Sequence, residues 1–349
     1  MKKFSEMLDG KKLEEKFNKT YNKISNNAKD SFCFNKNEQC NNKIIRAHTI
    51  QENRILNQLS ENGDVLYISY GDRELKFKKV GKGKATTFTG FCGYHDNKIF
   101  SPIENYDFIK ENKEQQFLFA YRIIAREYYA KIHSKNICEK FMEALENPQK
   151  EIINGCPLQF LDSYTLEECK IRQEQLLKST NYDIRDLNFY KKILNKSLKE
   201  EKFEVINTYC LEFDVKCGLA VASWCYLTQD LNVKVINDTF DYKEKMRPLL
   251  ITIFPQNNKT YILLSYFNED KHKFKAFINQ FKNLEEDKKK IAISNLIVFN
   301  CENFVFSPKH WSMLSDNEKE LIKLRFQYEN RESKEWFFSN DLNLFEDRY

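Results

Sequence analysis

The sequence predicts an α+β protein in three parts, namely a metal-binding N-terminal unit, a helical connector and a mixed, mainly antiparallel C-terminal domain. Three observations support this prediction. Cysteines and histidines cluster between residues 33 and 95, apolar residues recur every three to four positions from 114 to 145, and strand-like alternation begins after residue 205. We therefore expect domains at 1–104, 105–207 and 208–349.

Composition limits the kinds of partner that this chain can have. Its 349 residues are 41% hydrophobic, which is enough for real cores, and 56 Lys and Arg against 51 Asp and Glu give a net charge of only +5. Any affinity for nucleic acid must then come from a local basic patch. No apolar run reaches the roughly 20 residues that a membrane span requires, so we expect no membrane partner.

The same composition bears on cellular location. The N-terminal lysines lack the apolar core of a signal peptide, which predicts a cytoplasmic protein with reduced thiols. Its ten cysteines should then be metal ligands or buried small side chains rather than disulfides. The frequent Lys, Asn, Ile and Phe are typical of an AT-rich bacterial genome.

The N-terminal unit should contain short elements. Residues 1–30 favour a polar helix, and 49–65 an amphipathic helix that ends near Asn62 and Gly63. Strands are expected at Val65–Tyr70 and Glu74–Val80, joined by a turn at Gly71 and Asp72.

The remaining chain changes from helical to mixed patterns. In the connector, the apolar spacing predicts helices over Glu114–Leu145, Ser163–Thr180 and Ile184–Asn207. In the last part, we expect strands within Thr208–Leu227 and a hairpin of Pro248–Phe254 with Thr260–Phe267. Further along, the pattern predicts helices over His272–Leu284 and Glu285–Ser294, a strand over Asn295–Asn300, and a helical stretch from Ser307 that includes Asp316–Phe326.

Four side chains form the predicted metal site. Cys92 and His95 are separated by two residues, a spacing that lets both face one ion from a tight turn, and Gly90 and Gly93 supply backbone freedom there. Cys thiolates and His nitrogens are the ligands of structural zinc. The preferred set is completed by Cys33 and Cys40, which are six residues apart. The alternative is buried cysteines beside a surface histidine.

The order of these segments resembles the zinc-bearing HNH endonucleases, which have a treble-clef, or ββα-metal, fold. The resemblance rests on the two cysteines, on residues 45–50, which include Ala47 and His48, and on the Cys92–His95–Asp96 segment. It covers about 70 residues and implies a treble-clef-like N-terminal unit. Where the family usually has an acidic residue or a histidine directly before its catalytic histidine, this chain has Ala47. The segments also resemble a bacterial protein type found near phage-defence genes.

Carried over to this chain, the resemblance implies a metal-dependent nuclease. His48 would be the general base, and Asp96 or Asn97 would contact a catalytic Mg²⁺ or Mn²⁺, to which Glu104 could reach back. A neutral imidazole suits proton abstraction near pH 7, and a carboxylate suits Mg²⁺. The structural alternatives are that His48 is a fourth zinc ligand or a buried hydrogen-bonded ring, and that Asp96 caps the following helix.

A lysine-rich turn is the predicted contact with nucleic acid. It holds Lys76, Lys78, Lys79, Lys82 and Lys84 without an acidic residue, and Phe77 and Phe88 flank it and could stack bases. A solvated hairpin tip explains the lysines equally well. Two functions therefore stay open: a zinc protein that binds and cleaves nucleic acid, in phage defence for instance, or a non-catalytic subunit that binds a protein partner through a structural zinc site.

Overall fold

The computed structural model describes residues 22–69, 76–146, 166–323 and 336–348. The chain forms two compact units, one comprising 1–31, 71–73 and 128–188 and the other comprising 32–70, 74–127 and 189–349. These units differ from the three domains expected from the sequence. Strands from the predicted first domain and the predicted third domain belong to one sheet, so the boundaries at 104 and 207 do not separate folding units.

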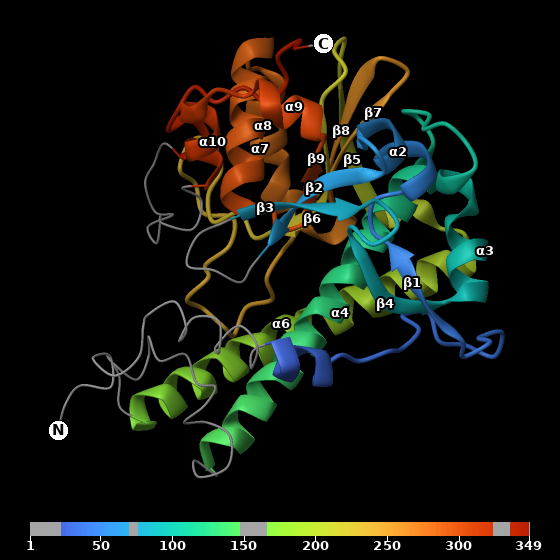
Figure 1. Cartoon of the computed structure of the whole chain (residues 1–349), viewed down its shortest axis with the longest axis vertical. Helices are drawn as coiled ribbons and strands as arrows, with labels where there is room; N and C mark the ends of the chain where they lie inside the picture. Colours follow the sequence, from blue (N-terminus) through green and yellow to red (C-terminus); the bar gives the residue numbers. More distant parts are fainter. Residues whose placement is uncertain (1–21, 70–75, 147–165, 324–335, 349) are drawn as a thin grey trace. The chain divides into compact units, whose positions relative to one another are not determined.

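A seven-stranded sheet is the centre of the larger unit. Its strands follow the order β3-β2-β9-β6-β7-β8-β5, and every neighbouring pair is antiparallel (Figure 1). The mixed, antiparallel character predicted from the sequence is confirmed. The strands are β2 (Asp64–Ser69), β3 (Lys76–Gly81), β5 (Ile206–Phe213), β6 (Leu219–Cys225), β7 (Leu249–Gln256), β8 (Lys259–Phe267) and β9 (Phe304–Phe306).

The predicted C-terminal hairpin is confirmed as β7 and β8. Gln256 pairs with Lys259, so the loop has two residues, Asn257 and Asn258, with φ of 52° and 60°. Two positive φ values define a turn whose twist matches that of the strands, and asparagine tolerates this conformation better than other residues with a Cβ.

Helices cover both faces of this sheet because the strands alternate apolar side chains between them. On one face, Ile251 and Ile253 join a core with Phe274, Phe277 and Phe281, which come from α7. On the other face, the ring of Phe254 lies 5.2 Å from that of Phe119 in α4 (Lys113–Glu146), and that of Phe267 lies 4.1 Å from Tyr190 in α6 (Leu166–Glu200). The helices of the first face are α7 (Lys271–Lys282) and α8 (Glu286–Asn300) (Figure 1).

A separate two-stranded sheet belongs to the same unit. Antiparallel strands β1 (Ile44–His48) and β4 (Thr87–Cys92) pair from Ile44 opposite Cys92 to His48 opposite Thr87. Helix α3 (Gly93–Glu104) begins directly after β4. Between β1 and β4 the chain forms η2 (Glu52–Leu56) and α2 (Asn57–Leu59) and then contributes β2 and β3 to the large sheet. The helical segment ends at Leu59, earlier than the sequence predicts, and Asn62 and Gly63, both with positive φ, instead form the turn between the bridged residues Glu61 and Asp64.

Two long helices extend through both units. The first is α4 (Lys113–Glu146), which confirms the helix expected over Glu114–Leu145. The second is α6 (Leu166–Glu200), one continuous helix where two were predicted. In the smaller unit, His133 Nε2 donates a hydrogen bond to the carbonyl of Ser25 (2.9 Å), within a segment whose residues 22–27 are helical. The expected helix start at 163 and the turn at 71–72 lie outside the described residues.

The strand predicted at 295–300 is wrong, since these residues lie in α8. Every residue from Ala292 to Val298 is buried, so this part of the helix has no polar side and lacks helical periodicity. The sheet takes its strand from β9 instead. The remaining elements are η3 (Phe203–Val205), η4 (Asn268–Asp270), α9 (Pro308–Met313), α10 (Asp316–Lys323) and η6 (Trp336–Phe338), and α9 and α10 agree with the predicted helical stretch.

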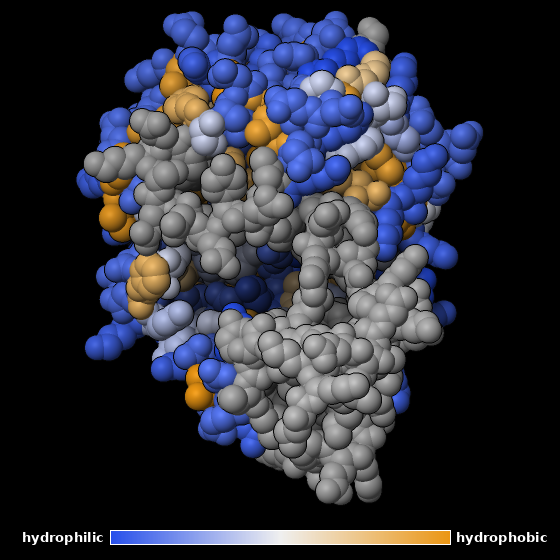
Figure 2. Space-filling model, turned by 60° about the vertical axis from the view of Figure 1, so that its left-hand side comes forward, coloured by the Kyte–Doolittle hydropathy of each residue, from blue (hydrophilic) through white to orange (hydrophobic). Residues whose placement is uncertain are grey.

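Among the described residues visible in Figure 2, hydrophilic side chains prevail and apolar side chains gather only in small groups. Among the described residues, no helix combines the length and apolar character that crossing a bilayer requires.

The β7–β8 turn allows a test of the fold. Replacing Asn258 by Val should lower the free energy of unfolding by about 1–2 kcal/mol, because a β-branched residue resists positive φ. The change would appear as a lower urea midpoint with an unchanged slope. Asn258→Gly should be neutral or stabilising, and an equal loss in both variants would contradict the turn.

Candidate metal centre

The four predicted metal ligands converge in the larger unit. One ligand atom from each of Cys33, Cys40, Cys92 and His95 lies within 4.8 Å of the other three. Cys33, Cys92 and His95 are buried, and Cys40 is half-buried. His48 is not a member of this group, so the alternative that it is the fourth ligand is not supported.

Cys92 and His95 are positioned by the start of helix α3. Cys92 is the N-terminal capping residue, and its Sγ accepts a hydrogen bond from the backbone N–H of His95 (3.5 Å). The side chains of Cys92, at the end of β4, and His95, in the first turn of α3, are therefore directed towards the same site. Neither Gly90 nor Gly93 has positive φ. Gly90 is needed for space instead, since a Cβ there would lie 2.4 Å from the ring of Phe88.

The first two cysteines lie on the segment before β1. Backbone N–H groups of Phe32 and Phe34 donate to the carbonyls of Thr89 and Gly90 (3.3 and 2.8 Å), so this segment runs along β4 and brings Cys33 towards Cys92. Phe34 is fully buried and packs edge-on against Tyr121, which anchors the segment in the core.

Hydrogen bonds determine the tautomer of His95. Asn37 Oδ1 accepts from the backbone N–H of Gln39 (2.9 Å) and also contacts His95 Nε2 (3.1 Å). Because that atom is an acceptor, Nε2 must carry the proton, which leaves the lone pair of Nδ1 for a metal. Nδ1 lies 3.2 Å from the Sγ of Cys33 and 3.3 Å from that of Cys92. In a tetrahedral zinc site these separations are about 3.5 Å, so the group fits such an ion.

The electrostatics of the cluster also favour a cation. Burial lowers the pKa of His95, with a further contribution from Lys98, which keeps the ring neutral as ligation requires. Burial and the nearby Cys92 raise the pKa of the Cys33 thiol to about 12. For Cys92, burial opposes ionisation, but hydrogen bonds from the backbone of His95 and Asn41 lower its pKa overall. A divalent cation would allow all three thiolates to form together.

A second polar cluster lies on an adjacent face of α3. Asp96, Phe100 and Glu104 are four residues apart and share one face of this helix. Arg122 of α4 lies 3.9 Å above the Phe100 ring and forms an ion pair with Glu104 (Nη2 to Oε1, 2.6 Å). Asp96 occupies the first turn and is not the capping residue, so the capping alternative is wrong.

His48 completes this second cluster. It ends β1, and its Nε2 donates to the carbonyl of Lys82 (3.2 Å) and lies 3.7 Å from Glu52 Oε2. Burial raises the pKa of Asp96, and Glu104 adds to the rise, whereas Arg122 and His48 oppose it. In the described part of the chain, Asp96 Oδ1 and Nε and Nη1 of Arg122 are buried without a hydrogen-bond partner.

The five lysines predicted to contact nucleic acid do not form the tip of a hairpin. Lys76, Lys78 and Lys79 belong to β3, an edge strand of the large sheet, and Lys82 and Lys84 follow it in the turn that faces His48. Lys78, Lys79 and Lys84 are exposed. The two phenylalanines are not available to bases. Phe77 packs on Trp311 with ring centres 4.5 Å apart, and Phe88 is 5% exposed.

Sequence analysis missed the contribution of Asn37, because an asparagine in a loop carries no local signal of this role. Comparison of the chain with protein-family models, curated proteins and solved structures gives no match.

The hydrogen bond from His95 to Asn37 can be tested. Outer partners of ligating histidines typically contribute 10- to 100-fold in metal affinity, so Asn37→Ala should weaken zinc binding by about that factor. Competition with a chromophoric chelator measures the affinity. Asn232→Ala removes an exposed amide outside the site and should leave zinc affinity unchanged. Equal affinities in both variants would contradict the role of Asn37.

Proposed function

We propose that this protein is a zinc-stabilised, metal-dependent nuclease in which His48 and Asp96 act on phosphodiester bonds. The observation that carries the proposal is the placement of these two residues, His48 at the end of β1 and Asp96 in the first turn of α3, the helix that directly follows the strand paired with β1. The element order supports a treble-clef-like unit, with two cysteines followed by the strand pair and a helix that begins between the other two ligands.

His48 is suited to be the general base. The Lys82 carbonyl accepts its Nε2 proton, which leaves the lone pair of Nδ1 to take a proton from water. The resulting hydroxide attacks phosphorus, and the bond from phosphorus to the leaving oxygen breaks. Glu52, 3.7 Å from Nε2, then stabilises the imidazolium. His48 can therefore act as a base even though it follows Ala47, where the HNH endonucleases usually have an acidic residue or a histidine.

Asp96 is suited to hold Mg²⁺ or Mn²⁺ together with the substrate. Mg²⁺ in nuclease and polymerase sites commonly uses one or two carboxylates, water and phosphate oxygens, and it supplies charge stabilisation to the leaving oxygen. Its Oδ1 lies buried without a partner in the described structure. Arg122, held by Glu104 and Phe100, would limit repulsion between the two carboxylates.

The lysines provide the local positive charge that a nucleic-acid substrate needs. Lys82 and Lys84 lie in the turn whose carbonyl holds His48, and Lys78 and Lys79 are exposed on the preceding strand. Phosphate contacts of this type would make binding strongly dependent on salt. A bacterial defence role against phage is proposed from the resemblance of the cysteine- and histidine-containing segments to a protein type found near phage-defence genes.

Nicking of supercoiled plasmid and of RNA with Mg²⁺ or Mn²⁺ tests the proposal. His48→Ala and Asp96→Asn should each reduce the rate by roughly 10²- to 10⁴-fold, the usual contribution of a general base or of comparable charge stabilisation. His272→Ala, at an exposed histidine outside the cluster, is the matched control and should retain the wild-type rate.

Zinc content and circular dichroism would establish that each variant is folded. Wild-type protein that leaves both substrates intact with either metal, or a His48→Ala variant as active as wild type, would reject the nuclease. The zinc unit would then have the structural role of a non-catalytic binding protein.

A further inference from the structure

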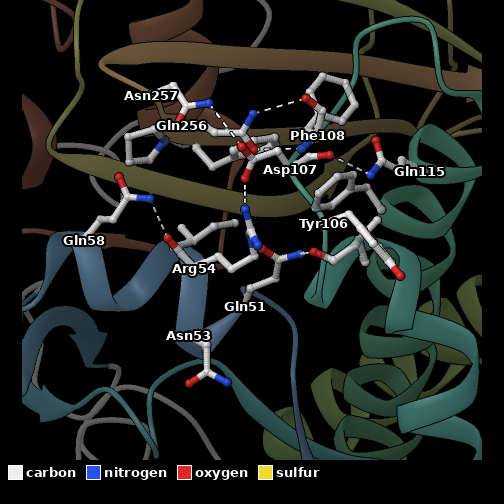
Figure 3. A pocket seen from close by; sticks show the side chains of 15 residues that line it. Gln51, Asn53, Arg54, Gln58, Tyr106, Asp107, Phe108, Gln115, Gln256 and Asn257 are labelled. Carbon is white, nitrogen blue, oxygen red and sulfur yellow. Dashed lines mark hydrogen bonds and ion pairs between the residues drawn. The ribbon is translucent and has the colours of Figure 1, made fainter.

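A cavity of about 320 Å³ opens beside the C-terminal end of α3. Its wall is formed by η2, by the loop after α3 and by the β7–β8 turn, all within the larger unit (Figure 3). Small-molecule sites typically enclose about 300–1,000 Å³, so this cavity suits a ligand of one or two rings. None of the proposed catalytic residues lines it.

The lining of the cavity has no net charge. Its two charged residues, Arg54 and Asp107, form an ion pair with each other. A phosphate would lack an uncompensated cation there, and a metal ion would lack a second carboxylate. Both kinds of charged ligand are therefore disfavoured, and the remaining lining is amide, aromatic and aliphatic.

Buried and half-buried amides make the cavity rigid. Gln256 accepts from the backbone N–H of Phe108 (2.8 Å) and donates to its carbonyl (3.1 Å). Gln115 donates to the carbonyls of Pro102 and Asp107 (3.0 and 2.9 Å). These bonds fix the loop after α3 against the sheet (Figure 3). A preformed site of this type costs little ordering free energy when a ligand binds.

The rim offers hydrogen bonds and one aromatic face. Asn53, Gln58 and Asn257 are exposed amides, and each amide side chain carries both donor and acceptor groups. Tyr106 is 66% exposed and lines the cavity, so its ring is accessible to a ligand. Neutral donor and acceptor groups beside an aromatic ring match the edge and face of a nucleobase.

We infer that this cavity binds one unpaired nucleobase of a single-stranded substrate, stacked on Tyr106 and hydrogen-bonded by the rim amides. The inference rests on the proposed function and specifies its substrate. The cavity and the catalytic cluster share two segments, because Ile103 precedes Glu104 and Gln51 follows His48 by three residues. From Asp96 to Tyr106 the helix and its end span roughly 15 Å, at 1.5 Å per residue. The bound base would lie within a few nucleotides of the cleaved bond.

Fluorescence of 2-aminopurine tests this inference without relying on cleavage. The His48→Ala protein, with zinc bound, would be titrated with a 2-aminopurine-containing oligonucleotide as DNA and as RNA, single-stranded or in a duplex, and with free 2-aminopurine riboside. We expect quenched emission and tight binding for the single strand, and much weaker binding for the duplex and the riboside. Adding Tyr106→Ala should weaken single-strand binding roughly 5- to 150-fold, as loss of one stacking partner does.

Tyr106→Phe should restore quenching, and Phe240→Ala, at a residue 78% exposed and outside the cavity, should leave it unchanged. Equal affinity of the Tyr106→Ala and Tyr106→Phe proteins for the single strand would overturn the inference. If the free riboside bound as tightly as the single strand, the cavity would be a site for free nucleosides, and the assignment of its ligand to a single-stranded substrate would be wrong. Because His48 is already replaced, quenching that depends on Tyr106 would support the cavity even if plasmid nicking failed.

Discussion

Three thiols and one imidazole converging on one point are the arrangement on which the N-terminal half of this structure depends. Within 4.8 Å, three ionised thiolates would repel one another strongly, whereas a single divalent cation turns the same geometry into attraction. Such sites contribute about 10–16 kcal/mol in small zinc peptides. The segment containing Cys33 and Cys40 has little regular structure of its own, so a bound cation would supply much of the free energy that keeps it folded.

The same arrangement positions the second polar cluster. The strand pair β1–β4 carries Cys92 at one end and His48 at the other, and α3 presents His95 to the metal site and Asp96, the next residue, on an adjacent face. Fixing one face of this short helix therefore fixes the other. Two half-buried carboxylates beside the buried Arg122 are costly to assemble, and strongly perturbed groups of this kind are often found at functional sites.

Local signals in the sequence were sufficient for some parts of the structure and insufficient for others. The pair Cys92 and His95 and the β7–β8 hairpin follow from spacing and alternation, so both were predictable. The pairing of β2 with β9 joins Leu66 to Phe306, and nothing near either residue encodes so distant a contact. The sequence of the wholly buried part of α8 lacks the alternation of apolar and polar residues that distinguishes a helix from a strand. Arg122 acquires its role only through packing on α3.

X-ray absorption at the zinc edge would test the central claim most directly. The account predicts one zinc per chain, with three sulfur ligands near 2.3 Å and one nitrogen ligand at about 2.0–2.1 Å. A Cys40→Ser variant should lose one sulfur from that shell. A chain purified without metal, or a spectrum with only oxygen and nitrogen neighbours, would contradict the account.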